Sequence, residues 1–195
     1  AGKIHKPKIS NLKLDMKGIY YLPRIFKSSK LGDAAILKEL IKILKENNIK
    51  VIKSNFFNPE LTLKKGNFSK IKPNKLDSSS IKKGIKSLNN LNSYNHAQGL
   101  IIRNNKVIRK ETSKGTKKML QSINKIKDAG AILIKFPKKK QDLRVDLPTV
   151  GLDTIKDCKK YNLKGIVLKS NQNIFMDKKR SINFANKNKI FIKII

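Results

Sequence analysis

The chain has 195 residues, of which 38% are hydrophobic and 6% aromatic, and it contains no Trp. This length allows one large domain or two small ones, and no apolar run approaches the roughly 20 residues needed to cross a bilayer. The formal net charge of +33 favours anionic partners, but the excess of Lys, with abundant Asn and Ile, is also typical of an A/T-rich genome, and the basic stretches lack interleaved aromatics.

The first predicted elements form a helix–strand unit of an α/β fold. Residues 1–30 are expected to form loop and a short helix. Residues 34–44 carry apolar side chains at the spacing of one helix face, and Asp33 is a plausible N-cap. Residues 49–52 are then expected to form a short strand.

A second, larger region follows an irregular segment. Residues 55–77 are rich in Lys, so we predict a linker or exposed loop there, with a domain boundary near residue 58. Helices are predicted at 78–92, 115–128, 154–161 and 178–188, and strands at 99–102, 107–108, 131–134, 165–168, 174–176 and 190–195. This alternation indicates an α/β architecture. We therefore expect one domain over residues 1–58 and a second, catalytic α/β domain over residues 59–195.

Chemistry is expected in one short run, residues 141–149, with the sequence QDLRVDLPT. The chain has only 13 acidic residues, yet Asp142 and Asp146 fall in this run, on either side of Arg144. If the run is extended, these three alternate side chains project from the same face. Two carboxylates can hold a hard divalent cation such as Mg²⁺, and an Arg can donate two parallel hydrogen bonds to phosphate oxygens.

The surroundings of the run also suit an anion. Thr149 and Gly151 open a loop before a predicted helix, and the N-terminus of a helix attracts negative charge. The run follows a predicted strand, where α/β proteins tend to place their sites. A surface strand with a local Asp–Arg–Asp ion network would show the same spacing, so spacing alone leaves both interpretations open.

Two further groups are weaker candidates for phosphate binding. Gly115 and Thr116 precede a predicted helix, where they could present backbone amides or form an ordinary Gly turn with a Thr N-cap. Lys135 and Lys138 lie just before the central run and could neutralise a diphosphate. In a chain this rich in Lys, however, a given Lys is more often a solvated surface group.

The Cys and His residues point to no site of their own. The single cysteine, Cys158, cannot form an internal disulfide, so a reducing compartment is expected. Its position in a predicted helix favours a packing role. His5 and His96 are too isolated to indicate a metal triad or a catalytic dyad.

The central run has a family resemblance. With Lys135 and Lys138 before it and Val150, Gly151, Asp153 and Thr154 after it, the run resembles the signature of the UDP-2,3-diacylglucosamine pyrophosphatases of lipid A synthesis, LpxI type. Other segments follow in the order of that family: residues 1–7, Gly32 with Asp33, Gln98, Glu111, and Gly115 with Thr116 before Met119 and Leu120. The resemblance extends over essentially all 195 residues.

The resemblance also shapes the expected domain organisation. The sequence joins the family pattern at the end of the N-terminal domain, so we expect a two-domain α/β protein with the first domain only partly present. Several positions depart from the pattern: Lys6, Ala34, Asn95, Lys114 and Lys117. Most of these departures remove a negative charge, which puts any role of those acidic positions in doubt and leaves the central run whole.

The resemblance implies hydrolysis of UDP-2,3-diacylglucosamine to UMP and 2,3-diacylglucosamine 1-phosphate, with Mg²⁺ as the usual cation and the substrate between two domains. It implies an essential Asp, which is Asp142 or Asp146, and both are also the expected metal ligands. Substrate contacts are expected from Lys3, Gln98, Gly115, Thr116, Lys135, Lys138, Gln141, Arg144 and Thr149. The protein would be cytoplasmic and peripheral at the inner membrane, where anionic headgroups attract its positive surface.

Two alternatives remain. The charge is also compatible with a basic RNA- or ribosome-associated binding protein without catalytic activity, but the absence of aromatic platforms and the two rare carboxylates beside Arg144 oppose that interpretation. The chain could also be a folded but inactive piece of the enzyme. Because aromatic platforms are absent, no specific nucleic acid partner is expected.

Overall fold

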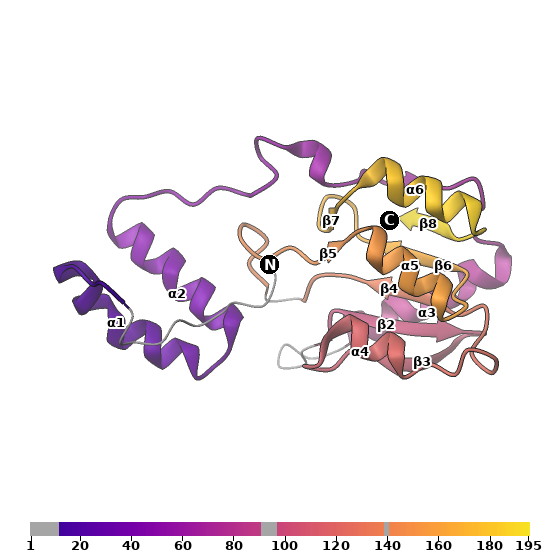
Figure 1. The fold of residues 1–195 in the computed structure, drawn as a ribbon, viewed down its shortest axis with the longest axis horizontal. Coiled ribbons are helices and arrows are strands. Elements are labelled where there is room, and N and C mark those ends of the chain that lie inside the picture. Colours follow the sequence, from indigo (N-terminus) through magenta and orange to yellow (C-terminus); the bar gives the residue numbers. More distant parts are fainter. Residues whose placement is uncertain (1–11, 91–96, 139–140) are drawn as a thin grey trace. The chain divides into compact units, whose positions relative to one another are not determined.

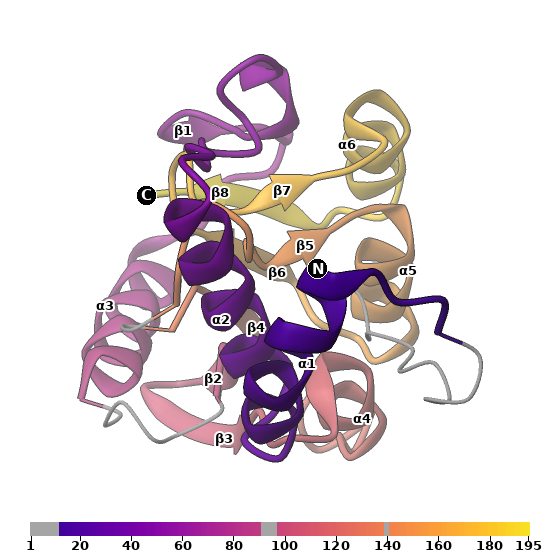
Figure 2. The same ribbon diagram turned by 90° about the vertical axis from the view of Figure 1, so that its left-hand side faces the viewer.

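The computed structural model describes residues 12–90, 97–138 and 141–195. The chain divides into two compact units: Ala1–Phe57 with Gln141–Leu147, and Asn58–Lys140 with Pro148–Ile195. Figures 1 and 2 follow the chain through both units in two views. Among the described residues, no helix combines the length and the apolar character that crossing a bilayer requires.

The first unit contains a pair of helices, α1 (Met16–Ser29) and α2 (Asp33–Glu46). The predicted helix over 34–44 is confirmed, but Asp33 lies in its first turn, and Gly32 occupies the N-cap. The predicted strand over 49–52 is wrong. Asn48 adopts a left-handed backbone (φ 58°), and the Ile49 N–H donates to the Leu44 carbonyl at 2.8 Å. This is a Schellman-type helix ending, so the backbone of Ile49 takes part in the end of α2 and not in a strand.

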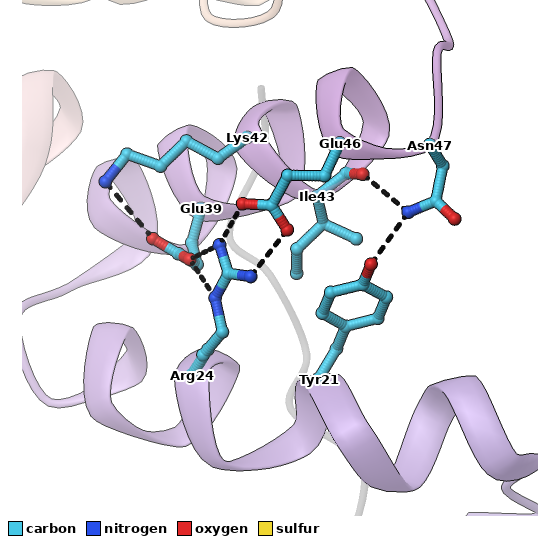
Figure 3. A network of polar contacts seen from close by, with 7 residues as sticks. All are labelled: Tyr21, Arg24, Glu39, Lys42, Ile43, Glu46 and Asn47. Atoms are coloured by element: carbon cyan, nitrogen blue, oxygen red, sulfur yellow. Dashed lines mark hydrogen bonds and ion pairs between the residues drawn. The ribbon is translucent and has the colours of Figure 1, made fainter.

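Polar side chains join the two helices (Figure 3). Arg24 on α1 donates hydrogen bonds to Glu39 at 2.7 Å and to Glu46 at 2.6 and 2.7 Å, both on α2. The Arg24 guanidinium lowers the pKa of both carboxyl groups. The Asn47 amide donates to the Tyr21 hydroxyl at 2.9 Å. Because these groups are partly exposed, the network orients the helices more than it stabilises them.

The second unit is built on a six-stranded sheet in the order β1-β8-β6-β4-β2-β3. The strands are β1 (Gly66–Asn67), β2 (Gly99–Arg103), β3 (Lys106–Lys110), β4 (Ile132–Lys135), β6 (Gly165–Leu168) and β8 (Phe191–Ile194). Strands β4, β6 and β8 run parallel to one another, and the other pairings are antiparallel. Strands β5 (Thr149–Val150) and β7 (Ile174–Phe175) form a separate parallel pair. The predicted α/β architecture is confirmed.

Helices cover both faces of this sheet: α3 (Lys75–Asn89) on one side, and α4 (Gly115–Gln121), α5 (Leu152–Lys160) and α6 (Lys178–Lys187) on the other (Figure 2). The apolar core divides in the same way. Ile132 and Ile134 pack with the α3 side, whereas Leu133 between them packs with the α4–α6 side. This alternation along β4 is what a strand buried on both faces requires.

Local side chains decide where two predicted elements turn or end. The hairpin between β2 and β3, which joins the predicted strands at 99–102 and 107–108, turns at Asn104 and Asn105, whose φ of 45° and 62° suit a two-residue hairpin turn. The predicted helix over 115–128 ends at Gln121 instead. The Asn124 side chain accepts the N–H groups of Ile126 and Lys127, at 3.0 Å each, and so competes with helical hydrogen bonds.

Gly165 at the start of β6 is required by the packing of an aromatic ring. A Cβ built there would lie 2.3 Å from the Phe191 ring, whereas one at Gly84 on α3 would lie closest to the Ile134 Cδ1 methyl group, with the Cδ1 methyl groups of Leu100 and Ile102 at 3.3 and 3.4 Å. We expect Gly165→Ala to lower the free energy of unfolding by about 1–3 kcal/mol. Gly84→Ala is the matched control, with a smaller loss, because the methyl can rotate away and Ala favours the helix. Urea unfolding of both variants would measure this difference, and equal losses would contradict it.

Candidate active site

The central run forms a turn rather than an extended segment. The Asp142 carbonyl accepts the N–H groups of Val145 at 3.2 Å and Asp146 at 3.0 Å. The Asp142 carboxylate also accepts the Arg144 backbone N–H at 3.0 Å. An Asp side chain that bonds the backbone two residues ahead stabilises a turn over an extended segment. The expectation that Asp142, Arg144 and Asp146 share a face through strand alternation is therefore wrong.

Asp142 and Arg144 form an ion pair through two parallel contacts. The Arg144 Nε donates to Asp142 Oδ1 at 3.0 Å, and its Nη2 donates to Oδ2 at 2.7 Å. The hydrogen bonds from Arg144 are the largest cause that lowers the pKa of Asp142, and Lys38 lowers it further. Asp142 is therefore a carboxylate at neutral pH, with its orientation set by a planar guanidinium.

This pairing makes Arg144→Gln a test of the charge state of Asp142. We expect the pKa of Asp142 to rise toward its ordinary value, measured from the pH dependence of its ¹³Cγ chemical shift. Because the folded pKa lies below the unfolded one, the stabilisation is present above the unfolded pKa and is lost as pH falls through the folded pKa. The difference in free energy of unfolding between wild type and Arg144→Gln should therefore become smaller as pH falls through the folded pKa of Asp142.

A matched control removes a Lys from a solvent-exposed ion pair. Lys156 contacts Asp153 at 4.0 Å, with side chains 53% and 99% exposed. Lys156→Gln should leave the Asp142 titration unchanged. An Asp142 pKa that is the same in wild type and Arg144→Gln would contradict the role given to Arg144.

The run is shared between the two units. Gln141–Leu147 groups with the first unit, where the Arg144 carbonyl accepts the Ser54 N–H at 3.1 Å. Pro148 and Thr149 belong to the second unit, and Thr149 is exposed at the start of β5. The two predicted catalytic carboxylates, with Gln141 and Arg144, are thus built into the unit that contains α1 and α2.

Whether the turn can hold a divalent cation depends on how many side-chain ligands it offers. Asp142 and Asp146 are half-buried and lie at the two ends of one turn. Within residues 12–90, 97–138 and 141–195, no group of three or more His, Cys, Asp or Glu side chains could hold a metal ion. Mg²⁺ is commonly bound through one or two carboxylates together with substrate phosphates and waters. Among the described residues, this turn therefore offers at most two carboxylate ligands, which is too few for a cation held by protein side chains alone.

In the second unit, Glu111 joins several predicted substrate-binding residues. Its carboxylate accepts the Gln98 backbone N–H at 3.1 Å and the Thr116 hydroxyl at 2.6 Å. The Lys135 ammonium donates to the Thr116 hydroxyl and lies 3.9 Å from a Glu111 carboxylate oxygen. Burial lowers the pKa of Lys135, and the charge of Glu111 partly opposes this effect. Lys135 is therefore a buried side chain at the end of β4, where a solvated surface group was the alternative.

Glu111 was not among the predicted site residues. A Cβ on Gly99 would lie 3.2 Å from its carboxylate, so the glycine permits the close approach of β2. The only sequence signals for Glu111 were its rarity, as one of 13 acidic residues, and its place in the order of the resemblance. Its contacts with residues distant in the sequence become apparent only when the strands are paired.

The remaining predicted residues are placed as follows. Gly115 has φ of 81°, which favours glycine, and begins the seven-residue helix α4. Thr116 is not its N-cap, since Lys114 holds that position without a side-chain cap bond. Lys138 is half-buried in the loop after β4. Lys3 lies outside the described residues.

Comparison with known proteins bears on both units. A family model of the LpxI N-terminal domain matches residues 1–61, and a model of the LpxI C-terminal domain matches residues 64–193. The UDP-2,3-diacylglucosamine pyrophosphatase LpxI of Caulobacter vibrioides is 26% identical over 200 residues, which cover 98% of this chain and 71% of that protein. Since the C-terminal model alone spans more than half of the 195 residues, the chain belongs to the LpxI family.

Proposed function

We propose that this protein hydrolyses UDP-2,3-diacylglucosamine to UMP and 2,3-diacylglucosamine 1-phosphate in lipid A synthesis, with Asp142 and Asp146 as its catalytic carboxylates. The observation that carries the proposal is the turn over residues 141–147, which holds both carboxylates and Arg144 in one short segment of a chain with 13 acidic residues. Membership of the LpxI family and the activity named for the Caulobacter relative support it.

The proposed chemistry needs a diphosphate whose negative charge is neutralised before water attacks phosphorus. Arg144 can donate to phosphate oxygens from the part of its guanidinium that Asp142 leaves available, since its side chain is 43% exposed. Asp142, ionised by its pairing with Arg144, is suited to ligate a cation. Asp146 is suited to orient the attacking water or to share the cation, and the two assignments remain interchangeable.

We also propose that a divalent cation, Mg²⁺ or a similar ion, is required. Asp142 and Asp146 would hold it together with the substrate's phosphate oxygens. When bound, the cation would neutralise charge on the diphosphate and polarise its P–O bonds. The substrate lies at the inner-membrane surface, and the net charge of +33 favours peripheral attachment of the protein to anionic lipid there.

The experiment that tests the function is release of UMP from UDP-2,3-diacylglucosamine in mixed micelles with Mg²⁺, followed by ion-exchange chromatography. Release proportional to protein concentration is expected, with no release from UDP-N-acetylglucosamine, which lacks the acyl chains. RNA binding at physiological salt serves as the parallel assay. Tight RNA binding without UMP release would favour the binding-protein alternative.

A further inference from the structure

Glu111 lies where four segments of the second unit meet. Its own N–H donates to the Gly99 carbonyl at 2.9 Å, which fixes its backbone to the start of β2. One carboxylate oxygen accepts the Gln98 N–H, and the other accepts the Thr116 hydroxyl of α4. The Lys135 ammonium of β4 donates to that same hydroxyl. The side chains of Lys135 and Glu111 are only 10% and 6% exposed, so this chain of contacts is largely shielded from water.

The charge on Lys135 depends on this arrangement. Its strand neighbours are Gly99 on β2 and Leu168 on β6, neither of which is charged. Nearby, the Lys169 ammonium lies over the Phe136 ring. Of the described charged groups, Glu111 is the one whose charge raises the pKa of Lys135 against the effect of burial. A buried ammonium without a nearby carboxylate tends to lose its proton.

We propose that Glu111 is a positioning residue for the pyrophosphatase reaction: it fixes the Thr116 hydroxyl and keeps the Lys135 ammonium charged and in place to bind a substrate phosphate. This inference rests on the proposed function and adds to it a residue that does not itself touch substrate. Glu111 contacts three of the predicted substrate-binding residues, which a purely local structural role would not require.

The first test is the pH profile of kcat/KM for Glu111→Gln. Lys135 is a cation only below its pKa, and loss of the Glu111 charge lowers that pKa. The alkaline fall in kcat/KM should therefore begin at lower pH in the variant. The expected loss is about tenfold at alkaline pH, as for other residues that orient a binding group, and smaller near neutral pH. A merely structural defect would lower kcat/KM by the same factor throughout.

Four further variants separate the position of the Glu111 carboxylate from its charge. Glu111→Asp keeps the charge and should restore the wild-type alkaline limb. Glu60→Gln removes an exposed carboxylate from the same unit and should match wild type. Lys135→Met should lower kcat/KM by about 100-fold, as loss of a donor to developing negative charge does. Adding Glu111→Gln to Lys135→Met should then cost little more, because both changes act on one group.

A second readout needs no turnover. In protein labelled with [¹³C]lysine, the Cε resonance that Lys135→Met removes is that of Lys135. Its titration midpoint should fall in Glu111→Gln and return in Glu111→Asp. If Glu111→Gln does not fold, Thr116→Val, which removes the bridging hydroxyl, should shift the midpoint in the same direction.

The outcomes are distinguishable. Wild-type protein that releases no UMP would contradict the proposed function, while the Lys135 titration would still decide the link between Glu111 and Lys135. Active protein in which the alkaline limb and the Lys135 midpoint are unchanged in Glu111→Gln would overturn this inference alone. Full additivity of Glu111→Gln and Lys135→Met would overturn it as well.

Discussion

Asp142→Asn is expected to lower kcat for UMP release by about 100-fold or more, with little change in the folded state. Asn is nearly isosteric with Asp and can still accept the Arg144 backbone N–H, so the turn should persist. Asn is neutral and has a single acceptor oxygen, so it can neither ligate a cation as a carboxylate nor hold Arg144 by an ion pair. Loss of preorganised electrostatic groups at a reacting centre commonly costs about 10²–10³ in kcat.

Asp146→Asn tests the other carboxylate in the same assay. The two residues can be separated by varying Mg²⁺. A variant that has lost a metal ligand should recover part of its rate at high Mg²⁺, whereas one that has lost the group that orients water should not. Glu60→Gln again serves as the control for removal of one exposed negative charge. Wild-type kcat in either Asp variant would remove that residue from the proposed machinery.

Removal of divalent cations is expected to abolish UMP release. EDTA should lower the rate to background, and excess Mg²⁺ should restore it. Because the described residues offer no group of three metal-binding side chains, calorimetry should detect only weak Mg²⁺ binding until a diphosphate such as UDP is present. A rate unchanged by EDTA would contradict the metal requirement, and tight binding of Mg²⁺ without nucleotide would contradict a shared cation.

Elements with strong local signals could be predicted from the sequence. The hairpin at Asn104 and Asn105 has a turn that these residues favour, and the strand over residues 165–168 is a short apolar run with no competing pattern. The apolar stripe of the helix over 34–44 likewise predicted the helix itself. The N-cap residue could not be predicted, because the sequence allows either Gly32 or Asp33 to precede the first turn, and the structure places Gly32 there.

Other features depend on interactions that periodicity does not encode. Residues 49–52 have the composition of a strand, but Ile49 completes a helix ending. The run over 141–147 alternates like a strand, yet the Asp142 side chain bonds the Arg144 backbone and bends it. A single domain boundary near residue 58 cannot place residues 141–147 in the first unit, because this segment follows most of the second unit in the sequence. Glu111 gains its contacts only through strand pairing.

The most direct measurement is the initial rate of UMP release from UDP-2,3-diacylglucosamine with Mg²⁺, compared between wild type and the double variant Asp142→Asn/Asp146→Asn. Circular dichroism would first establish that both are folded. The predicted result is steady release by wild type and a rate at least about 100-fold lower for the double variant. Equal rates would contradict the central claim that the carboxylates of this turn perform the chemistry.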